Sequence, residues 1–198
     1  MKKILFIFVL VLLFALSSCI SFAVRTVRHI PLTEEEQHIA NLTSDMVHRF
    51  RLEEEKSYDI SIYFYHNGTI ESIGEVHGID TANDTKDVLI AGRRDGDVAF
   101  AWSIGVEGSI AMFSATDIDD DRELVMMKGI ANNMFFMDEG VEYGLIYVAY
   151  KEGNEFDTSD LFVFEAWDFV ESYEEKIDKL SPFTYAYIIT IQLGVETE

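Results

Sequence analysis

The strongest constraint on the fold is a two-residue alternation of apolar side chains that begins near residue 58. Ile60, Ile62 and Phe64 alternate with other side chains, and Asn67-Gly68 follows them as a strong hairpin signal. Successive side chains of a strand point to opposite faces of a sheet. The pattern therefore predicts an antiparallel hairpin with one buried face.

The return strand of this hairpin departs from the alternation. Between residues 70 and 79 the apolar side chains recur at every third position. Gly74 and Gly78 fall within this range, and glycine inside a strand often marks a β-bulge, where one extra residue shifts the pairing. The sequence therefore predicts a strand whose register is reset near each glycine.

Five later segments also read as strands, over residues 88–91, 98–104, 109–115, 141–150 and 183–193. Residues 98–104 carry large apolar side chains on one face and small ones on the other, which would let a helix pack closely. Residues 141–150 are apolar on both faces, which predicts a central strand that is covered on both sides. Residues 183–193 alternate again and follow Pro182, which ends any preceding helix.

Three segments favour helices. Thr33 and Glu36 have the spacing of a capping box, and the apolar stripe after them extends the predicted helix to Phe50. A second helix is predicted over about residues 119–136, and a third from about residue 159 to residue 180. With the strands, this pattern predicts an α+β fold, a largely antiparallel sheet of about seven strands packed with three helices.

The N-terminus has the layout of a secretory signal peptide. Lys2 and Lys3 precede an unbroken apolar run, and small residues follow it. The stretch Leu16-Ser17-Ser18-Cys19 resembles the lipobox of bacterial lipoproteins. The resemblance implies cleavage before Cys19 and acylation of both its thiol and the new N-terminus. Two or more acyl chains give a durable membrane anchor, so the expected location is the outer side of a membrane in a bacterial cell envelope.

A simpler alternative is an ordinary signal peptide that is cut after Ser21-Phe22-Ala23. In a eukaryotic secreted protein, Asn41, Asn67 and Asn83 would then be glycosylation acceptors, because each begins an Asn-x-Thr triplet. The architecture of the leader favours the lipoprotein.

Charge limits the partners of the chain. The whole chain has a net charge of −21, and the part from residue 30 onward holds 11 basic and 36 acidic side chains, a net charge of −25. Nucleic acid is excluded as a natural partner, because phosphate contacts need clustered Lys and Arg. The expected organisation is a signal peptide over residues 1–18, a lipidated tether over residues 19–31, and a single acidic α+β domain over residues 32–198.

The sharpest polar motif is an acidic run over residues 117–123. The carboxylates of Asp117, Asp119, Asp121 and Glu123 alternate, and they could converge on Ca²⁺, a hard cation that prefers oxygen ligands. The run is not an EF-hand loop, because Arg122 stands where that loop needs glycine. The simpler interpretation is the acidic N-terminus of a helix, which the helix dipole favours. No firm cofactor follows, and Ca²⁺ is the one that this run would take.

Motifs for catalysis are absent from the sequence. It contains no HExxH, no Gly-x-Ser-x-Gly, no glycine-rich phosphate loop and no CxxC. The histidines do not pair at the helical spacing of a zinc site, and we interpret them as solvated or structural. They are His29, His38, His48, His66 and His77.

Tyr63 and Tyr65 are the candidate binding residues, because Ile60, Ile62 and Phe64 already occupy the buried face of their strand. Exposed aromatic side chains could stack on sugars or contact a protein partner. The alternative is that they fill the core and direct their hydroxyl groups to water.

These observations favour a non-enzymatic, lipid-anchored binding or envelope-assembly module, with an envelope protein or a glycan as its partner. The alternative is a metal-assisted envelope hydrolase that uses the acidic residues 117–123.

Overall fold

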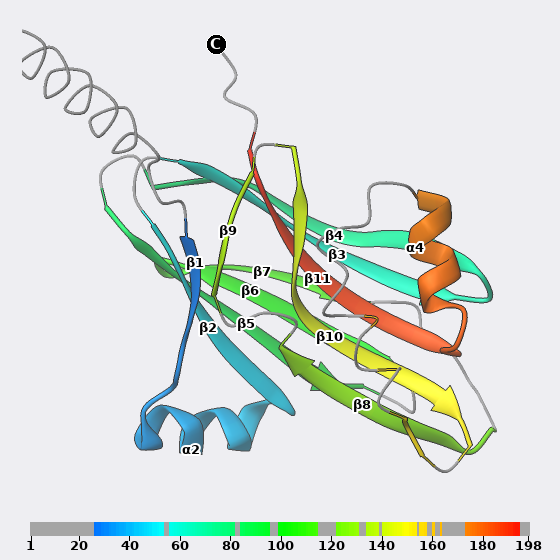
Figure 1. The fold of residues 1–198 in the computed structure, drawn as a ribbon. Helices are drawn as coiled ribbons and strands as arrows, with labels where there is room; N and C mark the ends of the chain where they lie inside the picture. Colours follow the sequence, from blue (N-terminus) through cyan, green and yellow to red (C-terminus); the bar gives the residue numbers. More distant parts are fainter. Residues whose placement is uncertain are drawn as a thin grey trace, which may run out of the picture.

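The computed structural model describes two antiparallel β-sheets and two short helices (Figure 1). The residues that it describes are 26–53, 56–81, 84–95, 99–114, 122–130, 134–138, 140–153, 155–157, 160, 163 and 173–194. None of the helices in these ranges is both long and apolar enough to cross a bilayer.

Sheet A has six strands in the order β7-β6-β5-β2-β1-β9, and every neighbouring pair is antiparallel. Its strands are β1 (Thr26–Ile30), β2 (Met46–Leu52), β5 (Lys86–Arg94), β6 (Phe100–Val106), β7 (Ser109–Ser114) and β9 (Met134–Phe136). Helix α2 (Glu34–Thr43) connects β1 to β2.

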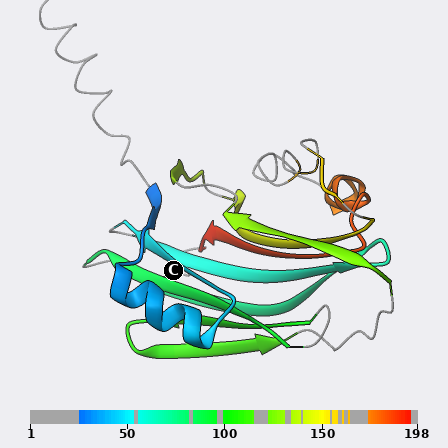
Figure 2. The same cartoon turned by 90° about the horizontal axis from the view of Figure 1, so that it is seen from below.

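Sheet B has five strands in the order β4-β3-β11-β10-β8, again antiparallel throughout. Its strands are β3 (Ser57–His66), β4 (Thr69–Asp80), β8 (Leu124–Ile130), β10 (Glu142–Glu152) and β11 (Tyr185–Leu193). Helix α4 (Tyr173–Leu180) lies on the side of sheet B that faces away from sheet A (Figure 2).

This architecture corrects the predicted fold class. An α+β fold with about seven strands and three helices was expected, whereas the described residues form a mostly β structure with eleven strands and two helices. The main reason is that two segments predicted to be helical form strands instead. The main core lies between the two sheets, so the helices contribute little to it.

The first predicted helix is correct at its start and wrong at its end. The Thr33 side chain accepts a hydrogen bond from the Glu36 N–H, and the Glu36 carboxylate accepts one from the Thr33 N–H, as a capping box requires. The helix ends at Thr43, and the residues from Met46 to Leu52 form strand β2. Residues 26–30, expected in the tether, form strand β1.

The second predicted helix is wrong over its described part, and the third is shorter than expected. Residues 124–130 and 134–136 form β8 and β9, although a helix was predicted over 119–136. Within the predicted helix at 159–180, the final eight residues form α4. Much of the remainder of that segment lies outside the described residues.

The hairpin and both register shifts are confirmed. Asn67 and Gly68 form the turn between β3 and β4 with φ angles of 49° and 76°. The pairing of β3 with β4 shifts between Tyr58 and Ile60 and again between Ile62 and Tyr63, opposite the segments that contain Gly78 and Gly74. Residues 143–150 are buried in β10, so the prediction of a covered strand is also confirmed.

Aromatic packing and a buried hydrogen bond join the two sheets. Phe100 and Trp102 on β6 lie 5.8 Å and 6.0 Å from the ring of Tyr187 on β11, measured between ring centroids. The main-chain N–H of Phe100 donates to the Tyr187 hydroxyl at 3.2 Å. The donor belongs to sheet A and the acceptor to sheet B, so this bond fixes the position of one sheet against the other.

The edge strands β4 and β7 approach each other at Gly74. A Cβ atom added there would lie 2.2 Å from Cδ1 of Phe113, which is too close for the existing packing. We expect Gly74→Ala to lower the free energy of unfolding by about 1–3 kcal/mol, the usual cost of overpacking. Urea denaturation measures the loss, and the double variant Gly74→Ala/Phe113→Leu should recover part of it. Equal stabilities of the two variants would contradict the clash.

Candidate functional site

The inner face of sheet A changes from apolar to polar at one end. His29 on β1 lies opposite Phe50 on β2, and His48 is two residues before Phe50 on the same strand. All three side chains therefore share the face that points toward sheet B. The ring centroids of His29 and His48 are 5.5 Å apart, and those of His29 and Phe50 are 5.4 Å apart. The apolar row thus continues into a pair of imidazoles.

Strand β8 of sheet B contributes the opposite wall. Lys128 lies opposite the buried Val148 of β10, which places its side chain on the face of β8 that points toward sheet A. The Nζ atom of Lys128 donates a hydrogen bond to the main-chain carbonyl of Asp45 at 2.7 Å. This contact brings together residues that are 83 positions apart in the chain.

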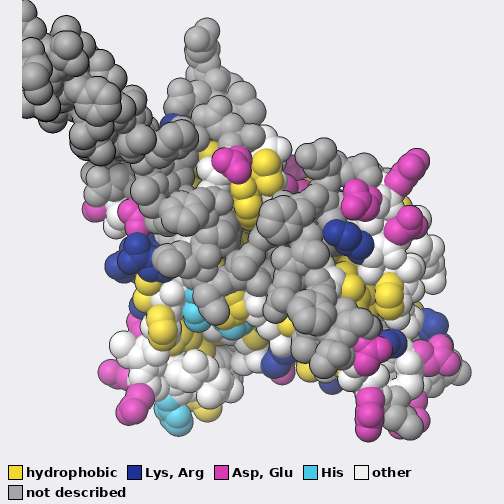
Figure 3. All heavy atoms as spheres, in the orientation of Figure 1, with side chains coloured by type: hydrophobic (Ala, Val, Ile, Leu, Met, Phe, Trp, Pro, Cys, Tyr) yellow, Lys and Arg dark blue, Asp and Glu magenta, His cyan; other side chains and the backbone are white. Residues whose placement is uncertain are grey.

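Helix α2 completes the enclosure with Gln37 and Asn41, whose side-chain amides are joined by a hydrogen bond of 2.9 Å. The four elements surround a pocket of about 670 Å³, here named the intersheet pocket. Its polar lining residues are His29, Gln37, Asn41, Asp45, His48 and Lys128. The volume lies in the range of sites that bind small molecules. Histidine side chains reach the surface over β1 and β2 in the view of Figure 3.

Burial keeps both imidazoles of the intersheet pocket neutral at neutral pH. Desolvation lowers the pKa of His29, and it is also the largest cause that lowers the pKa of His48, to about 4. The neighbouring His29 and Lys128 lower the pKa of His48 further by repulsion between positive charges. A neutral imidazole has one N–H donor and one acceptor nitrogen. Each ring can therefore both donate a hydrogen bond and accept one.

The hydrogen-bonding capacity of this pocket is largely unused. Within the described part of the chain, the main chains of His29 and His48 pair in sheet A, whereas neither imidazole forms a hydrogen bond to another residue. One of the three N–H groups of Lys128 donates to the Asp45 carbonyl, and Lys128 forms no ion pair with a described carboxylate. The pocket therefore presents an ammonium group and two imidazoles that are available to a ligand.

Tyr63, one of the two predicted binding residues, lies in a polar cluster on the outer face of sheet B. The ammonium group of Lys176 lies 5.9 Å from the centre of its ring and forms an ion pair with Glu142 at 2.9 Å. Thr190 also donates to Glu142, at 2.5 Å. Burial and the Glu142 charge raise the pKa of Tyr63, so its hydroxyl stays protonated. The contacts on Glu142 are those of a satisfied structural network.

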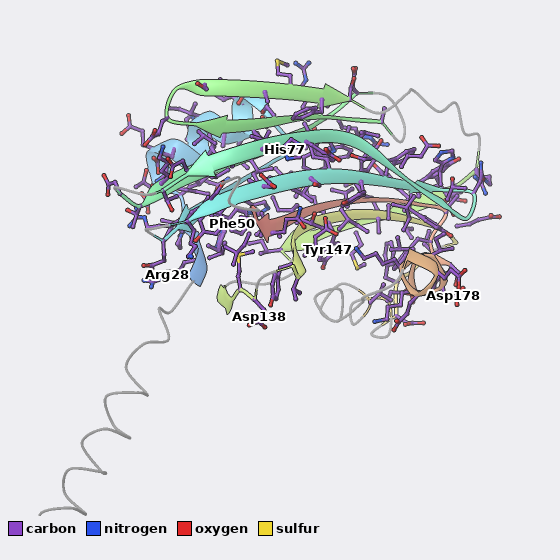
Figure 4. The ribbon with its side chains drawn as sticks, turned by 90° about the horizontal axis from the view of Figure 1, so that it is seen from above. Arg28, Phe50, His77, Asp138, Tyr147 and Asp178 are labelled. Carbon is purple, nitrogen blue, oxygen red and sulfur yellow. The ribbon has the colours of Figure 1, made fainter. Side chains whose placement is uncertain are left out.

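Tyr65, the other predicted binding residue, is only 4% exposed. It belongs to a second apolar cluster on the outer face of sheet B, together with Leu180 of α4 and Phe183. Figure 4 views the layers from the edge, with Tyr147 on β10 and Asp178 on α4 labelled, and α4 lies on the side away from the green strands β6 and β7. Tyr63 and Tyr65 therefore lie on the same face of the sheet, but in different surroundings.

The remaining predicted site residues fall largely outside the described part of the chain. Cys19, Asp117, Asp119 and Asp121 all lie there. Glu123 is described and exposed, just before β8. Within the described residues, no group of three or more His, Cys, Asp or Glu side chains is placed to hold a metal ion.

The intersheet pocket was not predicted from the sequence. His29 and His48 were interpreted as solvated or structural, and His48 was placed on a helix, whereas it lies on β2 beside His29. The usable signal was the alternation of Met46, Phe50 and Leu52, which places His48 on the buried face of a strand. Lys128 gave no signal, because only the tertiary fold brings it to the pocket.

Comparison with protein-family models, with curated proteins and with solved structures gives no match for this chain. Inference of function therefore depends on the residues of the chain itself.

Proposed function

We propose that this protein is a lipid-anchored, extracytoplasmic binding module that takes up a small polar ligand in its intersheet pocket. The observation that carries the proposal is the convergence of β1, α2, β2 and β8 on one pocket with unused hydrogen-bonding groups. Such a pocket, with a few polar groups set among apolar residues, is the usual form of a small-molecule site.

The anchor is supported by the resemblance of residues 16–19 to a lipobox. Strand β1 begins at Thr26, seven residues after Cys19. An extended chain of seven residues spans at most about 25 Å. Lipidation at Cys19 would therefore keep β1, and with it the wall of the pocket that carries His29, close to the membrane surface.

The first experiment tests the anchor in a bacterial host. The full-length protein should incorporate labelled palmitate and sediment with membranes, whereas Cys19→Ser should lose the label and leave the lipoprotein pathway. The matched control is Ser18→Ala, which keeps the thiol and a small residue before it. Equal labelling of wild type and Cys19→Ser would contradict lipidation at this residue.

The second experiment tests the pocket. Thermal unfolding of the full-length protein in non-ionic detergent should be followed with neutral sugars, carboxylates and phosphates as added ligands. A ligand that binds the folded state raises the unfolding temperature. At a hundredfold excess over Kd it adds about 2.7 kcal/mol to the free energy of unfolding. The rise should disappear in His48→Leu. A midpoint that no ligand class raises, or that rises equally in His48→Leu, would contradict binding in this pocket.

A further inference from the structure

We infer that the intersheet pocket recognises the anionic group of its ligand, a carboxylate or a phosphate, which Lys128 and the imidazoles of His29 and His48 hold between sheets A and B. This inference rests on the proposed function and specifies the chemistry of the ligand. The pocket is large enough for a small molecule that carries such a group, because its volume is about 670 Å³.

The first argument is the charge of Lys128. The chain holds 36 acidic and 15 basic side chains, so a lysine has many carboxylates with which it could pair. Lys128 nevertheless forms no ion pair with a described residue, and its ammonium group donates to the neutral main-chain carbonyl of Asp45. Lys128 is an exposed residue of the pocket lining, and an ammonium group there without an ion-paired carboxylate attracts an anion from solution. Two of its three N–H donors remain for that anion.

The second argument is the geometry of the two imidazoles. Their ring centroids lie 5.5 Å apart on neighbouring strands, and their planes meet at 61°. Carboxylate and phosphate groups carry several acceptor oxygens, so one group can accept hydrogen bonds from more than one donor at once. The two rings face the same pocket from β1 and β2, and Lys128 faces it from β8. Donors on three elements can thus converge on one anion.

The one carboxylate in the lining is already engaged. Oδ2 of Asp45 accepts a hydrogen bond from the main-chain N–H of Arg94 at 2.5 Å. Besides His48 and Asp45, the polar groups that line the pocket are His29 from β1, Lys128 from β8, and the uncharged amides of Gln37 and Asn41 from α2. The balance of groups that face the imidazoles is therefore basic or neutral, apart from the occupied carboxylate of Asp45.

Anion binding in this pocket should depend on pH. In the free protein, burial and the positive charge of Lys128 keep His48 neutral. A bound anion reverses that balance, because an opposite charge nearby favours the protonated imidazole. Binding is then accompanied by proton uptake, and affinity rises as pH falls. One proton taken up changes Kd by at most about tenfold per pH unit.

The experiment uses the full-length protein in non-ionic detergent, with inorganic phosphate and acetate as probes. Imidazole signals in NMR spectra report directly on the pocket, since His29 and His48 can be assigned by His29→Gln and His48→Gln. At least one of the two probes should shift these two signals. Titrations at about pH 7.5 and pH 5.5 should show tighter binding at the lower pH. Nanodiscs that contain phosphatidylglycerol form a separate arm, which distinguishes a lipid headgroup from a free anion.

Two variants make the result specific. Lys128→Met should raise Kd for the effective anion about tenfold, the loss expected for one charge-assisted hydrogen bond. Lys86→Met is the matched control, because it removes the same charge from β5, where Lys86 pairs with Glu107 at 2.9 Å outside the pocket. The control should bind the anion as wild type does.

Several results would overturn the inference. Binding of a neutral sugar or of Zn²⁺ to the same two histidines, without an effect of any anion, would keep a binding function and reject the anionic ligand. Equal loss of affinity in Lys128→Met and Lys86→Met would show that only the net charge of the protein matters, and would reject Lys128 as a specific contact. If no probe shifts either histidine signal, the pocket is not a binding site, and the proposed function is rejected as well.

Discussion

Replacing Trp102 with alanine is expected to lower the free energy of unfolding by about 3–5 kcal/mol, the usual cost of removing a large buried aromatic side chain. Trp102 is 1% exposed and packs against Phe100 at 5.4 Å and Tyr187 at 6.0 Å between ring centroids. A Cβ atom added at Gly92 would lie 2.7 Å from its ring, so the indole also fills the space above that glycine. Denaturant titration followed by circular dichroism measures the loss.

Trp102→Phe is the matched control and should cost less than half as much. Within the described residues, the indole Nε1 of Trp102 has no hydrogen-bond partner, so phenylalanine removes volume without breaking a polar contact. An equal loss in both variants would show that the cavity left by alanine is not the source of the effect.

Acid should destabilise the protein through His48. The pKa of His48 is about 4 in the folded protein, compared with 6.5 for a free imidazole, because burial disfavours its charged form. The unfolded chain therefore binds more protons than the folded chain between these two values, and stability falls as pH falls through that window. The full loss of stability is about 3 kcal/mol: it is complete below the folded pKa of about 4, and nothing is lost above pH 6.5.

His48→Leu removes this contribution and should flatten the decrease of the unfolding free energy between pH 6.5 and about 4. His38→Gln is the matched control, because His38 is an exposed residue of α2 and does not line the pocket. The control should keep the acid sensitivity of the wild type. Urea titrations at several pH values separate the two, and identical slopes in wild type and His48→Leu would contradict the assignment.

Local chemistry explains which parts of the fold could be predicted. Asn67-Gly68 specifies its turn because both residues adopt positive φ angles there. Gly78 and Gly74 lie in the two segments of β4 where the pairing with β3 shifts, which the threefold spacing of the apolar residues had indicated. The strand at β10 was recognisable because both of its faces are apolar. Each of these signals lies within a dozen residues of the structure that it specifies.

The error over α2 and β2 shows where such signals fail. Ile39, Leu42, Met46 and Phe50 have helical spacing, yet Ile39 is 57% and Leu42 is 74% exposed, while the other two are buried in a strand. The helical stripe is therefore a coincidence between the exposed side of a short helix and the inner face of a strand. A polar residue, His48, occupies that inner face and hides its alternation.

The candidate site could not be predicted for a related reason. Its residues come from β1, α2, β2 and β8, and each segment alone contains an ordinary polar residue. Only the crossing of β8 over the end of β2 brings Lys128 to Asp45 and to the two imidazoles. In the same way, Tyr65 was expected at the surface, because its strand already had a buried face, and the second apolar cluster covers its other face.

The position of β1 in sheet A has a mechanical consequence. This strand lies between β2 and β9, so both of its edges are hydrogen-bonded. A force transmitted through the residues before Thr26 pulls along the strand, whereas its inter-strand bonds run across it. The load would then be shared by all of these bonds at once in shear, instead of opening them one after another as in peeling an edge strand. A pulling force applied at the N-terminal end would thus act on a strand that resists extraction from the sheet.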